Sequence, residues 1–166
     1  MTSREWRQIS QDDRETIEAH QDAAPVRLTN IAHALGLSIK ASTLPAGISG
    51  EIRPDEEHPG SYIIRVNRHD AKRRQRFTVA HEIAHYLLHE DAIGGGITDD
   101  VLYRSNVSNS QEAQANRLAA DILVPENLLN QWLETAKALG IDDIVGYLAD
   151  RFEVSEASMR IKLGLE

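Results

Sequence analysis

Hydrophobic and polar positions recur with a helical period over residues 76–89, which read Arg-Phe-Thr-Val-Ala-His-Glu-Ile-Ala-His-Tyr-Leu-Leu-His. At about 100° per residue, the apolar side chains of this stretch form one broad arc. Threonine, glutamate and three histidines occupy most of the remaining circumference. The pattern predicts a helix packed on a core, with its chemical groups together on one flank.

The spacing of apolar residues predicts further elements on both sides of this helix. Asp70 is the expected N-cap of the helix itself, and Ser110 that of a later helix ended by Pro125. Alternating apolar and polar residues predict three strands, which would form an antiparallel or mixed sheet with residues 62–67 at its edge. The predicted helices are 25–35, 111–124 and a helix–turn–helix over 144–165, and the predicted strands are 37–41, 48–53 and 61–67.

Composition places the chain among ordinary globular proteins. It has 166 residues, 41% of them hydrophobic and 27% charged, with a net charge of −8. The acidic balance argues against strong nucleic-acid binding by the whole chain. The absence of cysteine excludes disulfides and thiolate chemistry. The N-terminus lacks the apolar run of a signal peptide, and no stretch is long enough for a membrane span, so a soluble cytoplasmic protein is expected.

The spacing of His81 and His85 favours metal binding. Residues at i and i+4 of a helix lie one turn apart on the same face, so both imidazoles can reach one ion. Two imidazoles and a carboxylate suit Zn²⁺ with water in the fourth position, and the same donors also bind Mn²⁺ or Fe²⁺. Glu82, beside the first histidine, is placed to take the proton of that water. The alternative is a surface helix that carries two histidines by chance.

Glu112 is the candidate third ligand. On a helical wheel it lies in the middle of the apolar arc of residues 111–124, where a carboxylate is costly unless it is paired or binds metal. Asn116, one turn later, is placed to orient it. The alternative is that Glu112 points to solvent and favours the helix dipole. His89 is two turns from His81, too far for joint ligation, and is interpreted as a supporting or helix-terminal residue.

Other residues have weaker claims to a role. Tyr103 and Arg104 could donate to a developing oxyanion, or Tyr103 could simply anchor its loop. Arg76 belongs to a strongly basic first helical turn. This turn is either a solvated helix face or a contact with an acidic partner, or Arg76 forms an ion pair with a carboxylate near the site. The remaining histidines have no metal-like spacing; they are His20, His33, His58 and His69.

Two motifs together resemble the ImmA/IrrE family of metallopeptidases. Residues 76–89 are similar to the family pattern R-F-T-x-A-H-E-x-x-H-x-x-L-H, and residues 112–125 to E-x-x-A-N-x-F-A-A-x-L-L-M-P. Leu118 replaces the usual phenylalanine and Val124 the usual methionine. The resemblance covers about residues 25–135.

The resemblance implies an α+β, zincin-like domain with a small three-stranded sheet. It implies His81, His85 and Glu112 as zinc ligands and Glu82 as general base. It also implies a helix-turn-helix repressor as the substrate, whose cleavage relieves repression in a stress-response or mobile-element locus. The expected division is a polar, loosely held N-terminal extension over 1–24, a metallopeptidase domain over 25–135 and a helical segment over 136–166.

The C-terminal helix–turn–helix pattern raises a competing hypothesis of DNA binding. Ser155 is the expected N-cap of its second helix. A DNA-reading helix normally begins with several basic or amide side chains, but Glu153 and Glu156 stand there, and only Arg160 and Lys162 follow. A packing or partner-docking role is therefore favoured, and no direct contact with DNA or a membrane is expected. A metal domain that senses a signal without cutting is the other alternative, which the presence of Glu82 disfavours.

Overall fold

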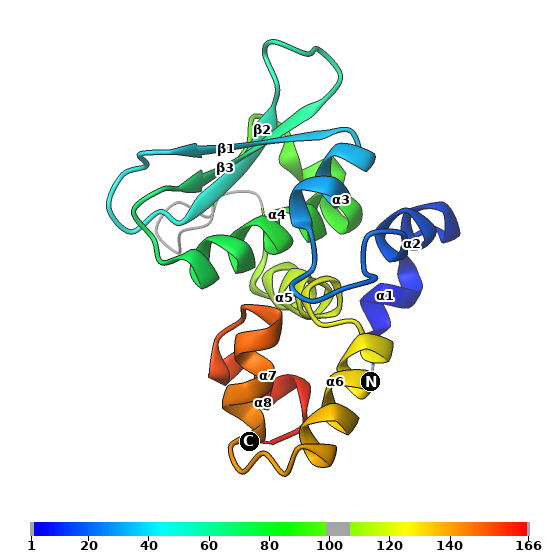
Figure 1. The fold of residues 1–166 in the computed structure, drawn as a ribbon. Coiled ribbons are helices and arrows are strands. Elements are labelled where there is room, and N and C mark those ends of the chain that lie inside the picture. The colour runs from blue at the N-terminus through cyan, green and yellow to red at the C-terminus, as the bar shows by residue number, and fades with distance from the viewer. Residues whose placement is uncertain (1, 99–106, 166) are drawn as a thin grey trace.

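The computed structural model describes residues 2–98 and 107–165, in which helices and a small sheet form an α+β fold. The helices are α1 (Arg4–Gln8), α2 (Gln11–Glu18), α3 (Leu28–Ala34), α4 (Lys72–Ile93), α5 (Asn109–Leu123), α6 (Glu126–Ala138), α7 (Ile144–Phe152) and α8 (Glu156–Lys162). The strands are β1 (Leu37–Ser42), β2 (Gly50–Pro54), β3 (Tyr62–Asn67) and β4 (Ile97–Thr98). Figure 1 shows the sheet above α4, α5 beneath α4, and α6–α8 in a separate layer below.

Within the described residues the sheet has four strands in the order β1-β3-β2-β4, one more than the sequence predicts. β3 runs parallel to β1 and antiparallel to β2, and β2 also pairs with the short β4. The prediction that residues 62–67 form the edge is wrong, because β3 returns between β1 and β2 and bonds to both. The described edges are β1 and β4.

The metal-motif helix α4 is enclosed on more than one flank. Its residues from Thr78 to His85 are all buried, and it packs against β2 and β3 on one side and α5 on the other. Ile64 and Val66 of β3 are buried with it. The prediction of a single buried arc therefore underestimates how deeply this helix lies in the core.

The N-terminal residues are held more firmly than their polar sequence suggests. Ile9 and Ile17 are buried, and both belong to the main hydrophobic core. Glu5 of α1 is fully buried and accepts hydrogen bonds of 2.8 and 3.0 Å from the guanidinium of Arg117 in α5. The expectation of a loosely held extension is corrected by this pairing, which joins residues far apart in sequence.

The C-terminal element has the predicted helix–turn–helix form. Glu153, in the turn between α7 and α8, has a left-handed backbone with φ 52°, and the Ser155 hydroxyl caps α8 by accepting from Ser158 N. The turn rests on the start of α4, where Lys72 pairs with Glu153 at 2.9 Å and Arg73 donates to the Val154 carbonyl at 3.0 Å. The helix–turn–helix is thus packed on the core at its turn.

Two expected helix caps differ in the structure. α4 begins after Ala71 without a side-chain cap, so Asp70 does not cap it. α5 begins after Ser108, two residues before the predicted Ser110, in a capping box with Gln111.

α6 runs to Ala138 and so continues past the expected boundary at residue 135. Within residues 2–98 and 107–165, none of the helices has the length and apolar character that crossing a bilayer requires.

Candidate metal centre

The structure brings His81, His85 and Glu112 to one point between α4 and α5. His81 Nε2 lies 3.1 Å from His85 Nε2, and the two carboxylate oxygens of Glu112 lie 3.1 Å from the first nitrogen and 3.0 Å from the second. All three side chains are buried. Among the described residues, this is the group of His, Asp or Glu side chains whose ligand atoms converge closely enough to hold an ion.

The spacing of these atoms fits a tetrahedral metal. Two atoms that each lie 2.0–2.1 Å from a zinc ion are about 3.3 Å apart at the tetrahedral angle. The observed separations of 3.0–3.1 Å are close to this value. Two nitrogens and a carboxylate suit zinc, and the same donor types also bind manganese or iron.

The protonation states of the cluster favour ligation. Burial lowers the pKa of His85, although the neighbouring Glu112 carboxylate opposes this, so the imidazole is neutral near pH 7. Burial alone would raise the pKa of Glu112, but hydrogen bonding to His81 and His85 outweighs it and holds that pKa well below the usual range. Neutral imidazoles and an ionised carboxylate are the forms that bind metal.

His89 lies against the back of His85. Its backbone departs from helical geometry (φ −133°, ψ 35°), and its Nδ1 lies 3.0 Å from His85 Nδ1. Its Nε2 donates to Gln114 Oε1 at 2.8 Å, so in the neutral ring Nδ1 is an acceptor. His85 Nδ1 therefore donates to His89, and the lone pair of His85 Nε2 faces the centre.

The sequence does not point to Gln114, because a helical wheel places it on the side of α5 opposite Glu112. It meets His89 where the α4 backbone departs from helical geometry. Phe77 is a second unforeseen neighbour, since its ring stacks on the His81 imidazole with 5.9 Å between centroids. Its position four residues before His81 is the signal that could have identified it.

Two predicted supporting residues do not touch the ligands. Asn116 is exposed, and among the described residues its side chain has no hydrogen-bond partner, so it does not orient Glu112. His81 Nδ1 is buried and likewise lacks a partner in the described part of the chain. Arg76 donates to the Val26 carbonyl at 3.0 Å, and within residues 2–98 and 107–165 it forms no ion pair with a carboxylate at the site.

Glu82 is fully buried in α4, directly after His81. Tyr103 and Arg104, the candidate oxyanion donors, lie outside the described residues.

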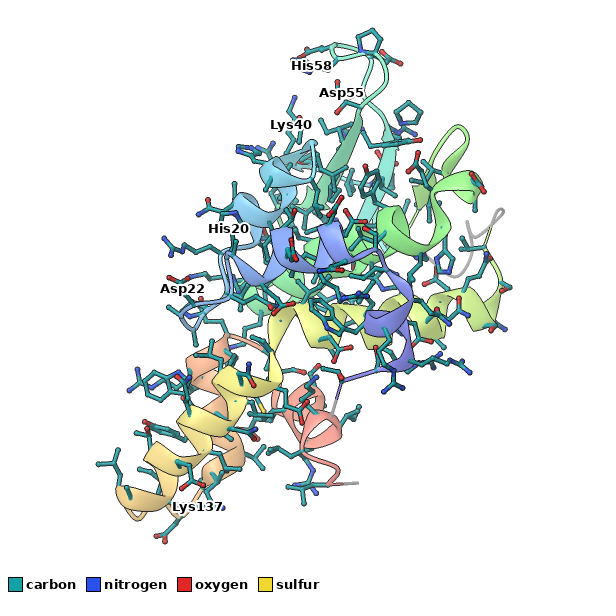
Figure 2. The ribbon with its side chains drawn as sticks, turned by 90° about the vertical axis from the view of Figure 1, so that its right-hand side faces the viewer. His20, Asp22, Lys40, Asp55, His58 and Lys137 are labelled. Carbon is teal, nitrogen blue, oxygen red and sulfur yellow. The ribbon has the colours of Figure 1, made fainter. Side chains whose placement is uncertain are left out.

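The remaining histidines lie away from the centre. Figure 2 labels His58 and Asp55 in the loop between β2 and β3, where His58 Nδ1 is 2.9 Å from a carboxylate oxygen of Asp55, and it labels His20 in the loop after α2. His69 contacts the Thr43 hydroxyl at 3.3 Å. His33 is exposed on α3.

A solved structure described as a Mycobacterium tuberculosis transcriptional regulator is similar to this chain, with a TM-score of 0.55 and 17% sequence identity. The match covers 95% of this chain and 48% of that one, so this chain spans about half its length. At this identity the likeness shows the fold alone. A search of the curated proteins found no match.

A family model for the IrrE N-terminal-like domain, Peptidase_M78, matches residues 32–163. This range includes both motifs of the candidate metal centre and confirms the resemblance on which the expected zincin-like α+β fold rests. Because the match extends over most of the chain, the protein belongs to the Peptidase_M78 family of metallopeptidase-type domains.

Proposed function

We propose that this protein is a zinc-dependent endopeptidase. The observation that carries the proposal is the convergence of His81 Nε2, His85 Nε2 and the Glu112 carboxylate at a buried point beside Glu82. The two imidazoles and the carboxylate would hold the ion. A zinc ion bound there would supply a water with a pKa near 7 and would polarise the peptide carbonyl.

Glu82 is the general base in this proposal. It follows His81 in α4, so it lies beside the ligand cluster on a rigid helix. Its carboxylate accepts a proton from the attacking water and then donates it to the departing amine, so that one carboxylate serves both steps. His89 and Gln114 keep the His85 ring turned toward the centre through the two hydrogen bonds described above.

Substitution of Glu82 tests catalysis separately from metal binding. The zinc-loaded wild type is expected to cut an unstructured peptide, and Glu82→Gln should lower kcat by about 10²–10⁴-fold while zinc content stays unchanged. Glu134→Gln, on the exposed face of α6, is the matched control and should keep full activity. Equal cutting by Glu82→Gln and wild type would overturn the role of Glu82.

We further propose that the substrate is a cytoplasmic helix-turn-helix transcriptional repressor, whose cleavage relieves repression in a stress-response or mobile-element locus. The support is membership of the Peptidase_M78 family together with the motif resemblance. Co-expression with a candidate helix-turn-helix repressor from the same organism, followed on a gel, tests it. Full-length repressor should disappear with wild type and persist with Glu82→Gln; its persistence in both would contradict this substrate.

The geometry does not favour the alternative of DNA binding through the C-terminal element. Lys162 is one of the two basic residues of α8, and its ammonium is buried in a 2.7 Å pair with Asp121 of α5. Arg160 remains exposed, but one cation and an acidic helix start provide little for phosphate or base contacts. Operator binding with a steep salt dependence that survives Glu82→Gln would support the DNA-binding alternative instead.

A further inference from the structure

A hollow of about 420 Å³ lies beside the candidate metal centre, between α4, α5 and α8. Its wall includes Phe77, one helical turn before His81 in α4, and Asn116, one turn after Glu112 in α5. The Phe77 ring stacks directly on the His81 imidazole. Four residues of helix rise about 6 Å, so on both helices a wall residue of the hollow stands one turn along the axis from a candidate ligand.

The surface of this hollow is mainly apolar, because its charged side chains are paired with one another or with neighbours. Asp121 pairs with Lys162, and their side chains are only 3% and 5% exposed, respectively. Arg117 pairs with the buried Glu5. Apart from Asn116 and two serines, the uncharged wall residues are apolar; besides Phe77 they are Ala120, Leu123, Val124, Val154 and Ile161. An uncharged, apolar group therefore fits the hollow better than a charged one.

Ile161 gives the hollow an exposed apolar rim. Its side chain is 69% exposed on α8, and it lines the opening. A single exposed aliphatic residue is ordinary on a protein surface, and Leu139, which is 63% exposed at the end of α6, is such a case. Ile161 differs because it borders a cavity next to the ligand cluster. The exposed carboxamide of Asn116 adds a hydrogen-bonding group to the same wall.

We propose that this hollow is a specificity pocket that receives a large apolar side chain of the peptide substrate. This inference rests on the proposed peptidase function and names the substrate feature that the site selects. The wall residues Phe77 and Asn116 stand one helical turn from the ligands His81 and Glu112, and an extended peptide advances about 3.3 Å per residue, so we place the selected residue one or two positions from the scissile bond. The Asn116 carboxamide is then within reach of the peptide backbone. The C-terminal helix α8 thereby contributes to substrate recognition.

Binding of zinc-directed probes tests the pocket without relying on catalysis. Two short peptide hydroxamates, which differ only in carrying leucine or glycine within two residues of the hydroxamate, are titrated into the zinc-loaded full chain. The leucine probe should bind at least about tenfold more tightly, as expected for burial of one aliphatic side chain. Ala120→Phe fills the hollow from α5 and should remove this preference while leaving the affinity for the glycine probe unchanged.

A second variant covers the case in which Ala120→Phe fails to fold. Ile161→Asn changes only an exposed rim residue and should weaken binding of the leucine probe severalfold, whereas Leu139→Asn, its matched control on α6, should not. Equal binding of the two probes to wild type, or equal effects of Ile161→Asn and Leu139→Asn, would overturn the pocket. A leucine preference without any peptide cleavage would instead contradict the peptidase function and leave the pocket standing.

Discussion

At the scale of single residues, the orientation of His85 depends on a neighbour that is not a ligand. His85 Nδ1 faces His89 Nδ1 at 3.0 Å, and His89 in turn donates to Gln114 at 2.8 Å. This chain of two hydrogen bonds leaves one tautomer of His85, with the Nε2 lone pair toward the centre. His89 is therefore a positioning residue, which acts through His85.

Removal of His89 should weaken metal binding without removing a ligand. His89→Ala leaves the Nδ1 proton of His85 without its buried acceptor, and zinc affinity should fall by about 10–100-fold. Competition against a chromophoric chelator measures this affinity directly. His33→Ala, on the exposed face of α3, is the control. If His89→Ala binds zinc as tightly as the control does, His89 does not position His85.

The candidate site was predictable where its geometry is local. His81, Glu82 and His85 are fixed relative to one another by the helical repeat alone, and Glu112 was found because an acid on an apolar arc requires a partner. Gln114 could not be found in this way, since the helical wheel places it opposite Glu112 and its contact is with His89, where the α4 backbone departs from helical geometry. Asn116 had the right spacing from Glu112, but its side chain faces the hollow instead of the ligands.

At the scale of elements, α4 is fixed against the sheet through Gly50 of β2. A Cβ atom at Gly50 would collide with the Thr78 methyl group of α4 and would lie 2.9 Å from the Arg65 carbonyl oxygen. Thr78 is fully buried one turn before Glu82. The absence of a side chain at residue 50 therefore allows the close approach of β2 to the helix that carries both histidines.

Gly50→Ala should destabilise the fold by about 1–3 kcal/mol, because the added methyl overpacks the β2–α4 contact. Adding Thr78→Ser removes the colliding methyl group and should restore part of the loss. Chemical denaturation of the single and double variants measures both effects. Gly95→Ala, where a Cβ would meet nothing within 4 Å, should be close to neutral. A Gly50→Ala protein as stable as Gly95→Ala would contradict the described packing.

The attachment of α1 to α5 should make stability depend on pH. The hydrogen bonds from Arg117 lower the pKa of Glu5 from 4.5 to about 2. Because the folded-state pKa lies below the unfolded one, the stabilisation is present above about pH 4.5 and is lost as the pH falls toward 2. Arg117 is half-exposed, so solvent screening reduces the contribution of the pair.

Glu5→Gln should lower the free energy of unfolding by about 2 kcal/mol at pH 7, since it breaks a pair whose carboxylate is buried. The difference from wild type should shrink at pH 3 and vanish only below about pH 2, where the folded-state carboxylate is protonated. Denaturation curves at several pH values test this, with Glu18→Gln on the exposed face of α2 as control. A difference that does not change with pH would show that the ion pair is not its cause.

Helices and strands are predictable from the sequence where their hydrophobic pattern is strong. They are not predictable where contacts with residues distant in the sequence determine the structure. The helix 144–152 and its turn follow from apolar spacing and from Ser155. The position of β3 in the middle of the sheet depends on how the chain crosses over between β1 and β2, which alternation along one strand does not encode. β4 has only two residues, Ile97 and Thr98, too few to show a period.

At the scale of the whole molecule, α5 joins both ends of the chain to the candidate centre. Its first turn carries Glu112, and further along, the Asp121 carboxylate accepts from the backbone N–H of Ser3 at 3.0 Å and from Lys162 at 2.7 Å. Figure 1 shows α5 in the middle of the molecule, with α4 above it and α6–α8 below. The N-terminal segment and α8 therefore meet on the helix that supplies a candidate ligand.

This convergence of the termini was not predictable from the pattern. A helical wheel places Asp121 and Arg117 on the polar side of α5 and so expects them in solvent. The structure covers that side with α1 and α8, because Glu5 and Lys162 complement the two charges. Complementary charges more than 100 residues apart, such as Glu5 and Arg117, leave no periodic signal in the sequence.

The central claim is that His81, His85 and Glu112 together hold one metal ion, and metal content tests it most directly. Elemental analysis of gently purified wild type should find close to one zinc ion per chain. His81→Ala and Glu112→Ala should each retain far less, while His33→Ala should match wild type. Equal zinc content in wild type, His81→Ala and Glu112→Ala would contradict the ligand set, and with it the proposed peptidase.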